Sequence, residues 1–333
     1  MNLTIRPSDH LPPEAGVAME RATEGTTYAP KLTEKKQSRT VKKFRPIHLV
    51  ALFLVSLLAA WHPLLRTLKL ALENDGYTHI LLILPLSVTF MCADWNLLQP
   101  ILKPSVRLGF LILCLAGVIA VLTLSHTPWM TADLRLTINM LALVTWWIGS
   151  FVVCFGTGVA RAMVFPLGFL YWMVPIPSIA LNRIVDCLQQ ESALATRLLF
   201  AIAGVPVVQD GLSLTIPGLT VEVAQECSSI RSSLMLLVTA MVLAQILLRS
   251  PWGKSLVIAL AVPLSVAKNG LRIFTIVMLG TRVDPGFLTG RLHHDGGIVF
   301  FSVTLVALFI LLWVLRRAEN HSLPSPVMRT VGP

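Results

Sequence analysis

Charged side chains are scarce in this sequence. Asp, Glu, Lys and Arg make up 13% of the 333 residues, whereas a typical soluble protein has about 25%. Hydrophobic residues account for 55%, and the mean hydropathy is +0.73. A chain with so few charges cannot cover itself with a charged surface. This composition excludes an ordinary soluble globule and indicates a protein built for lipid.

Cysteine is also rare, with five residues and no pair at CxxC spacing. This excludes a disulfide framework and gives no sign of a zinc site, so neither a metal nor a cofactor is expected. Three of the cysteines lie in apolar runs, where the thiol usually packs as a small hydrophobe. Cys227 differs because it lies in "AQECSSIRSS", residues 224–233, among hydroxyl and charged groups.

The net charge of +10 is unevenly placed. Residues 1–45 lack apolar periodicity and are expected to form a largely disordered tail. Much of the positive excess lies at the end of this tail, beside the first apolar run: Lys35, Lys36, Arg39, Lys42, Lys43 and Arg45. Such a cluster is typical of a cytoplasmic anchor at an anionic leaflet rather than of a nucleic-acid partner.

Long apolar runs fill most of the remaining chain. A membrane-spanning helix needs roughly 20 apolar residues, and the sequence predicts eight spans, at about 46–65, 79–94, 106–125, 134–154, 160–176, 231–249, 255–280 and 296–315. The expected fold is therefore an all-α polytopic membrane protein. Its domains would be the tail (1–45), the transmembrane domain (46–316) and a cytoplasmic C-terminal tail (317–333).

Basic residues in the short loops predict the orientation. With eight spans, the side that holds the N-terminal tail also holds Lys103, Arg107, Arg161, Arg249, Lys254, Arg316 and Arg317. The opposite loops carry several acids, namely Glu73, Asp75, Asp133 and Asp284. We therefore expect both termini in the cytoplasm of a bacterium, with the chain in its inner membrane.

The stretch between the fifth and sixth spans has a different pattern. Residues 178–204 mix apolar and charged groups at helical spacing, which predicts an amphipathic helix along the outer membrane surface. Residues 205–227 then alternate in polarity and are broken by Asp-Gly and Pro-Gly. This pattern predicts a short β-hairpin that leads to Cys227 at the outer mouth of the sixth span.

Three polar groups are predicted on this outer side. Cys227 begins the sixth span. "AKNGLRIF", residues 267–274, places Asn269 and Arg272 on one face of the seventh. In "RLHHDGGIVFF", residues 291–301, His293 and His294 precede the eighth. Arg272 is the most informative, because arginine within lipid costs about 2.5–3.5 kcal/mol and normally faces a cavity or a partner. The alternative is that Arg272 reaches the lipid headgroups.

Together these residue types are sufficient for acyl transfer. Neighbouring cations favour the nucleophilic thiolate of a cysteine. Histidine can pair with the thiolate and then protonate the leaving amine. Arginine can stabilise the oxyanion in a water-poor site. The residues alone leave open which of the two histidines takes part.

The order "ECSSIRSS", "NGLRI" and "HHDGGIVFF" resembles the exosortase/archaeosortase family of multi-pass membrane cysteine peptidase-transpeptidases. "GYTHILLILPLSV" (residues 76–88) and "FLYWMVPIPSIALNRI" (residues 169–184) extend the resemblance over most of residues 46–316. It implies a catalytic triad of Cys227, Arg272 and His293. Tyr77 and His79 match a family patch that is expected to contact substrate or to pack. Ser229 departs from the family, which often has Gly there.

The resemblance also implies the substrate. Members cleave exported proteins that carry a C-terminal tail with a short motif such as Pro-Glu-Pro, one transmembrane helix and a basic end. They transfer the new C-terminus to an acceptor such as a surface polysaccharide or a lipid. Two other hypotheses stay open: a transporter or polysaccharide-export component in which Arg272 binds an anion, and a metal or haem protein that uses His79, His293 and His294. Against the last, haem bundles usually place histidine pairs inside spans.

Overall fold

The computed structural model describes residues 38–93, 95, 105–124, 130–223, 230–289 and 291–322. Within these ranges, the side chains of residues 38–47, 75, 288, 289 and 291–296 are not described. The chain divides after Arg45 into two units, and the account below concerns the second, residues 46–333. The predicted tail at 1–45 lies almost wholly outside the described residues, although helix α1 begins at Ser38.

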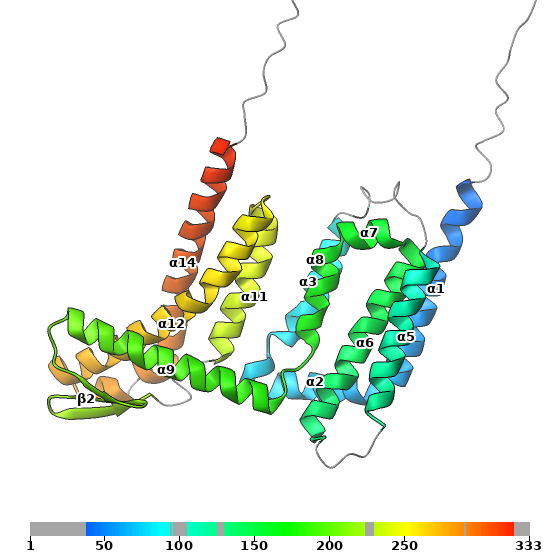
Figure 1. Ribbon diagram of the computed structural model, residues 1–333. Helices are drawn as coiled ribbons and strands as arrows, with labels where there is room; N and C mark the ends of the chain where they lie inside the picture. The colour runs from blue at the N-terminus through cyan, green and yellow to red at the C-terminus, as the bar shows by residue number, and fades with distance from the viewer. Residues whose placement is uncertain are drawn as a thin grey trace, which may run out of the picture. The chain divides into compact units, whose positions relative to one another are not determined.

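Helices make up most of the first half of the chain (Figure 1). They are α1 (Ser38–Ala59), α2 (Trp61–Glu73), the 3-10 turn η1 (Asp75–Tyr77), α3 (Ile80–Ala93), α5 (Val106–Leu122), α6 (Ala132–Phe155), α7 (Thr157–Ala162), α8 (Val164–Phe169) and the 3-10 turn η3 (Leu170–Met173). The second half contains α9 (Ser178–Ile202), three strands, α11 (Ile230–Leu247), α12 (Pro251–Arg282), α13 (Gly286–Thr289) and α14 (Arg291–Ser322).

The multi-pass, helical nature of the chain is confirmed, whereas the count of eight spans is not. The described residues contain four helices long and apolar enough to cross a membrane: α6, α11, α12 and Gly297–His321 of α14. The number rises to six if each of two bent helix pairs counts as one span. Two further apolar helices, α3 and α5, are shorter than the 18 residues expected of a span.

Proline explains why two predicted spans are broken. The predicted span 46–65 bends by 76° between α1 and α2, and Pro63 lies four residues after the end of α1. The predicted span 160–176 is divided between α7 and α8, and Pro166 lies four residues after the end of α7. A proline ring clashes with the carbonyl four residues earlier, so each helix ends where that clash would occur.

The segment 174–177, "VPIP", forms a fixed corner. It separates Val164–Met173 from α9, and the two helical segments meet at 97°. Thr137 of α6 donates a hydrogen bond to the Pro175 carbonyl at 2.9 Å, and Tyr77 donates one to the Ile176 carbonyl at 2.8 Å. The segment therefore ends one apolar stretch and begins the amphipathic helix.

The amphipathic helix is observed as α9, two residues shorter than predicted. Its first backbone N–H, at Ser178, donates to the carboxylate of Asp133 at 2.7 Å, which is the favourable position for a negative charge at a helix start. Its buried face includes Leu188, Ala193 and Phe200, whereas Leu194 and Leu198 are exposed.

The predicted hairpin is part of a three-stranded antiparallel sheet with the order β1-β2-β3. The strands are β1 (Val208–Asp210), β2 (Ser213–Ile216) and β3 (Leu219–Glu222). The Asp-Gly and Pro-Gly pairs form the two turns, with Gly211 and Gly218 at φ values of 58° and 86°, which favour glycine. Leu214 and Ile216 form a core with Phe200 of α9 and Ile273 of α12.

Helices α11, α12 and α14 pack around a second core, which includes Leu236, Ala244, Val257, Leu308 and Leu312. The carboxylate of Glu319 in α14 accepts hydrogen bonds from the backbone N–H groups of Arg249 and Ser250 at 3.0 and 3.1 Å. The C-terminal end of α14 therefore meets the N-terminal end of α12, and the two helices run antiparallel.

Candidate active site

One buried face of α12 carries an unusual set of side chains for a membrane helix. Four residues at spacings of four, three and four lie on this face: Ala261, Ser265, Lys268 and Arg272. All four are at most 9% exposed. Two cations are therefore buried one helical turn apart, and the positive charge of Arg272 acts on Lys268.

This face of α12 contacts the beginning of α11. The ammonium group of Lys268 donates a hydrogen bond to Ser232 Oγ, and Ser265 Oγ donates to Ser233 Oγ at 2.6 Å. Near the other end of α11, Lys254 Nζ donates to Gln245 Oε1 at 2.8 Å. The pairs show that the two helices are antiparallel. Arg272 lies one turn beyond Lys268, in the direction that leads past the N-terminus of α11.

Cys227 lies in residues 224–229, outside the described residues, but the chain is described on both sides of this segment. On the β3 side, Val223 is 1% exposed. Its N–H donates to the Leu212 carbonyl at 3.0 Å, and its carbonyl accepts a hydrogen bond from Gln189 Nε2 at 3.0 Å. On the other side, the segment leads directly into α11 at Ile230.

His293 and His294 lie in the first turn of α14, and their side chains are outside the description. Because α12 and α14 are antiparallel and joined through α13, the histidines begin α14 at the end where α12 finishes. The structure thus brings the backbone of the predicted histidine pair to the end of α12 that follows Arg272.

Gly270 and Asn269 lie in the same stretch of α12. A Cβ atom added at Gly270 would come within 2.8 Å of the Ala195 Cβ of α9 and 3.2 Å of the Thr196 backbone nitrogen. The Thr196 hydroxyl donates to the Gly270 carbonyl at 3.4 Å. Glycine therefore allows α9 to cross α12 in close contact. Asn269, next to this crossing, is completely buried.

Comparison with known proteins then decides the family. The family model described as Transmembrane exosortase (Exosortase_EpsH) matches residues 71–310, which is more than two thirds of the chain. This chain belongs to the transmembrane exosortase family.

Neither the curated proteins nor the solved structures gave a match to the chain. Membership in the exosortase family supports a membrane-embedded sorting peptidase or transpeptidase in general terms, acting on exported proteins. It also supports the resemblance that the three motifs indicated.

The patch around Tyr77 and His79 lies close to the start of α11 in this exosortase. A Cβ atom added at Gly76 would be 3.7 Å from Ile230 Cγ2, so η1 packs against the first residue of α11. His79 is 3% exposed, and its ring meets that of Trp172 edge-on with centroids 6.4 Å apart. Burial and the negative charge of Asp133 raise the pKa of Tyr77, which keeps its hydroxyl a hydrogen-bond donor.

Lys268 is a residue of the candidate site that the sequence analysis does not single out. "AKNGLRIF" was interpreted through Asn269 and Arg272 alone. A signal was nevertheless present, because a lysine four residues before an arginine in an apolar helix must share its face. Two cations on one face of a membrane helix are a stronger indication of function than one.

Proposed function

We propose that this exosortase is a cysteine sorting peptidase-transpeptidase with Cys227 as nucleophile, Arg272 as oxyanion donor and His293 as general acid and base. Its substrates are exported proteins whose C-terminal tail combines a short Pro-Glu-Pro type motif, one transmembrane helix and a basic end. The protein would lie in a bacterial inner membrane with both termini cytoplasmic and the site facing the periplasm.

The hydrogen bond between Lys268 and Ser232 carries the proposal. Cys227 precedes Ser232 by five residues, and Arg272 follows Lys268 by four. Because α11 and α12 are antiparallel, both steps lead toward the same end of the helix pair. Four residues of helix span about 6 Å, so Arg272 lies about one turn beyond the Lys268–Ser232 pair, and Cys227 is five residues from Ser232 along the chain. Arg272 lies on the same face of α12 as Lys268, which supports its assignment to the same site.

The proposed reaction has two steps. The Cys227 thiolate attacks the carbonyl carbon of the scissile peptide bond while Arg272 donates hydrogen bonds to the oxygen, which becomes negative. The C–N bond then breaks, His293 gives a proton to the leaving amine, and a thioester remains. In the second step His293 takes a proton from water or from an acceptor hydroxyl. The resulting nucleophile attacks the thioester and releases the thiolate.

The decisive experiment follows an exported reporter with such a tail in cells that make either the native protein or the Cys227→Ala or Cys227→Ser variant. Both variants should accumulate in the membrane at the native level and leave the reporter uncut. Full processing by Cys227→Ala would show that the thiol is not needed for cleavage, which would contradict the cysteine peptidase proposal. Cys154→Ala, which changes a buried thiol elsewhere, is the matched control and should process normally.

A further inference from the structure

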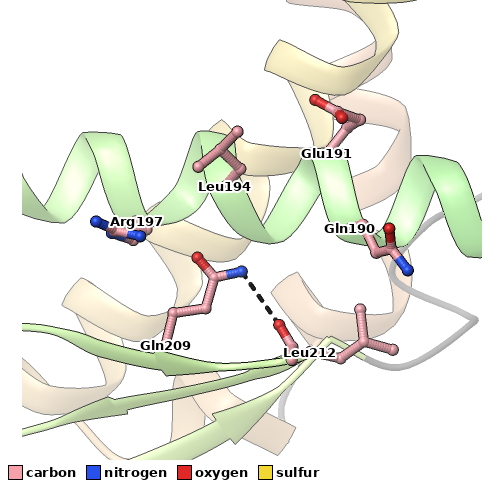
Figure 2. A pocket seen from close by; sticks show the side chains of 7 residues that line it. Gln190, Glu191, Leu194, Arg197, Gln209 and Leu212 are labelled. Atoms are coloured by element: carbon pink, nitrogen blue, oxygen red, sulfur yellow. Dashed lines mark hydrogen bonds between the residues drawn. The ribbon is translucent and has the colours of Figure 1, made fainter.

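A cavity of about 490 Å³ opens between α9 and the turn from β1 to β2. Figure 2 shows α9 along one side of it and the strands along the other. Its lining consists of Gln190, Glu191, Leu194 and Arg197 from α9, with Gln209, Gly211 and Leu212 from the sheet. We call this cavity the α9 groove. Arg272, the one proposed catalytic residue whose side chain the structure describes, is not among these lining residues.

The α9 groove contains a buried acceptor that lacks a donor. Gln209 Nε2 donates to the Gly211 carbonyl at 3.1 Å, which fixes the orientation of the amide. Gln209 Oε1 is buried and has no hydrogen-bond partner among the described residues, and it points toward α9 in Figure 2. A buried polar atom without a partner costs about 1–3 kcal/mol. An N–H or O–H group of a ligand in the groove would offset that cost.

The walls of the α9 groove are bonded to the strand that leads to Cys227. The Leu212 carbonyl accepts a hydrogen bond from the Val223 N–H. Gln189, adjacent to the lining residue Gln190, donates to the Val223 carbonyl. Cys227 follows Val223 by four residues, a chain length that spans at most about 14 Å. A ligand in the groove would therefore lie within a few residues' reach of the proposed nucleophile.

We propose that the α9 groove binds a short, extended stretch of the substrate polypeptide next to the scissile bond, with an acidic side chain facing Arg197. This rests on the proposed peptidase function. Seven residues of helix separate Gln190 from Arg197, which is about 10 Å and matches about three residues of extended chain. A backbone N–H of this stretch donates to Gln209 Oε1, and Arg197 is the one cation among the described residues that line the groove.

The lining favours polypeptide over a sugar. The two glutamine amides offer both donors and acceptors, which complement the alternating N–H and C=O groups of an extended chain. Glu191 and Arg197 add charges of opposite sign, which suit charged side chains. None of the seven lining residues that the structure describes is aromatic, so these residues offer no flat ring against which a sugar could stack.

The test measures cleavage of a purified tailed reporter by the detergent-solubilised full chain. Arg197→Glu and Gln209→Ala should each raise KM about tenfold, corresponding to about 1.4 kcal/mol, with kcat unchanged. Arg183→Glu is the matched control, because Arg183 is an exposed cation of α9 that does not line the groove. Its KM should stay at the native value.

A second measurement keeps binding separate from cleavage. A peptide copied from the reporter tail should bind to Cys227→Ala and lose about tenfold in affinity when Arg197→Gln is added. Replacing the acidic residue of the peptide by Gln should cost no further affinity in that double variant. Unchanged KM and affinity in the Arg197 variants would overturn the groove proposal alone, provided that cleavage still requires Cys227. The proposal would also be overturned if a soluble oligosaccharide inhibited cleavage of the reporter and the peptide did not.

Discussion

Lys268 of α12 and Ser232 of α11 are joined by a hydrogen bond inside the membrane-spanning part of the chain. The lysine is 6% exposed, and the next charge along its face is Arg272. A buried cation is costly in lipid, so one that also lies beside another cation is poorly explained by packing. Under the proposed function, Lys268 and Arg272 would together stabilise negative charge on a thiolate or an oxyanion.

Replacing Lys268 by Met should weaken this positive field while keeping a side chain of similar length. We expect the pH midpoint for alkylation of the Cys227 thiol to rise by about one unit, because a cation stabilises the thiolate. Lys268→Arg should keep the midpoint near its native value. The measurement is the rate of alkylation against pH, and equal midpoints in native and Lys268→Met protein would leave Lys268 as a purely structural link to Ser232.

Arg272 is expected to act through geometry as well as charge. Its planar guanidinium can donate two hydrogen bonds to one oxygen, which an ammonium group cannot reproduce in the same fork. Arg272→Lys should therefore lose at least about 100-fold in cleavage, the effect of removing one oxyanion donor, with normal membrane insertion. Reporter processing is compared at matched protein levels. If Arg272→Lys processed the reporter at the native rate, Arg272 would contribute only its positive charge or a contact with lipid.

Gly270 should resist even the smallest enlargement. In Gly270→Ala the new methyl would meet Ala195 of α9 at 2.8 Å, and overpacking of this kind costs about 1–3 kcal/mol. We expect a lower midpoint of thermal unfolding and reduced cleavage, because α9 must move away from α12. Gly168→Ala is the control, since a Cβ there meets nothing within 4 Å. An equal effect of the two substitutions would contradict the proposed close crossing.

The two histidines of α14 can be separated by single substitutions. Neighbouring helical positions point about 100° apart, so one histidine at most is expected to face the nucleophile directly. His293→Ala should abolish processing, whereas His294→Ala should retain most of it. Membrane levels are checked by immunoblot. The reverse pattern would assign the general acid and base to His294.

Thiol labelling should report the side on which the site opens. An impermeant maleimide added to intact spheroplasts is expected to label Cys227 and also Cys187, which is exposed on α9. It should spare Cys154, which is buried. Cys187→Ala isolates the signal of Cys227, and Cys227→Ala retains that of Cys187 as a control for access. Labelling of both only after permeabilisation would place the site in the cytoplasm.

The local structure around α9 was predictable because its signals are short-range. Helical spacing predicted α9, and the two Gly-containing turns predicted where the strands end. The broken spans were harder to predict, since Pro63 and Pro166 coincide with breaks whereas Pro85 and Pro263 lie inside continuous helices. Whether a proline interrupts a helix depends on packing that can replace the lost hydrogen bond, and hydropathy does not contain that information.

The residues of the candidate site also differ in how far the sequence alone predicts them. Arg272 could be identified from the cost of its charge in lipid, which is a property of one position. The contact between Lys268 and Ser232 joins residues 36 apart, and its existence depends on which faces of α11 and α12 meet. The α9 groove similarly needs Gln209 of β1 and Arg197 of α9 to face one another, which no local pattern predicts.

The corner at residues 174–177 sets the direction in which α9 leaves the preceding apolar segment. One end of α9 is fastened to α6 through Asp133, and its C-terminal half contacts α12 at Gly270. The helix is therefore held in place by two contacts. Gln189 and the α9 residues that line the groove belong to the same helix, so a movement of the helix would move them together. Because Gln189 donates to the Val223 carbonyl, a shift of α9 would also displace the end of the strand that precedes Cys227.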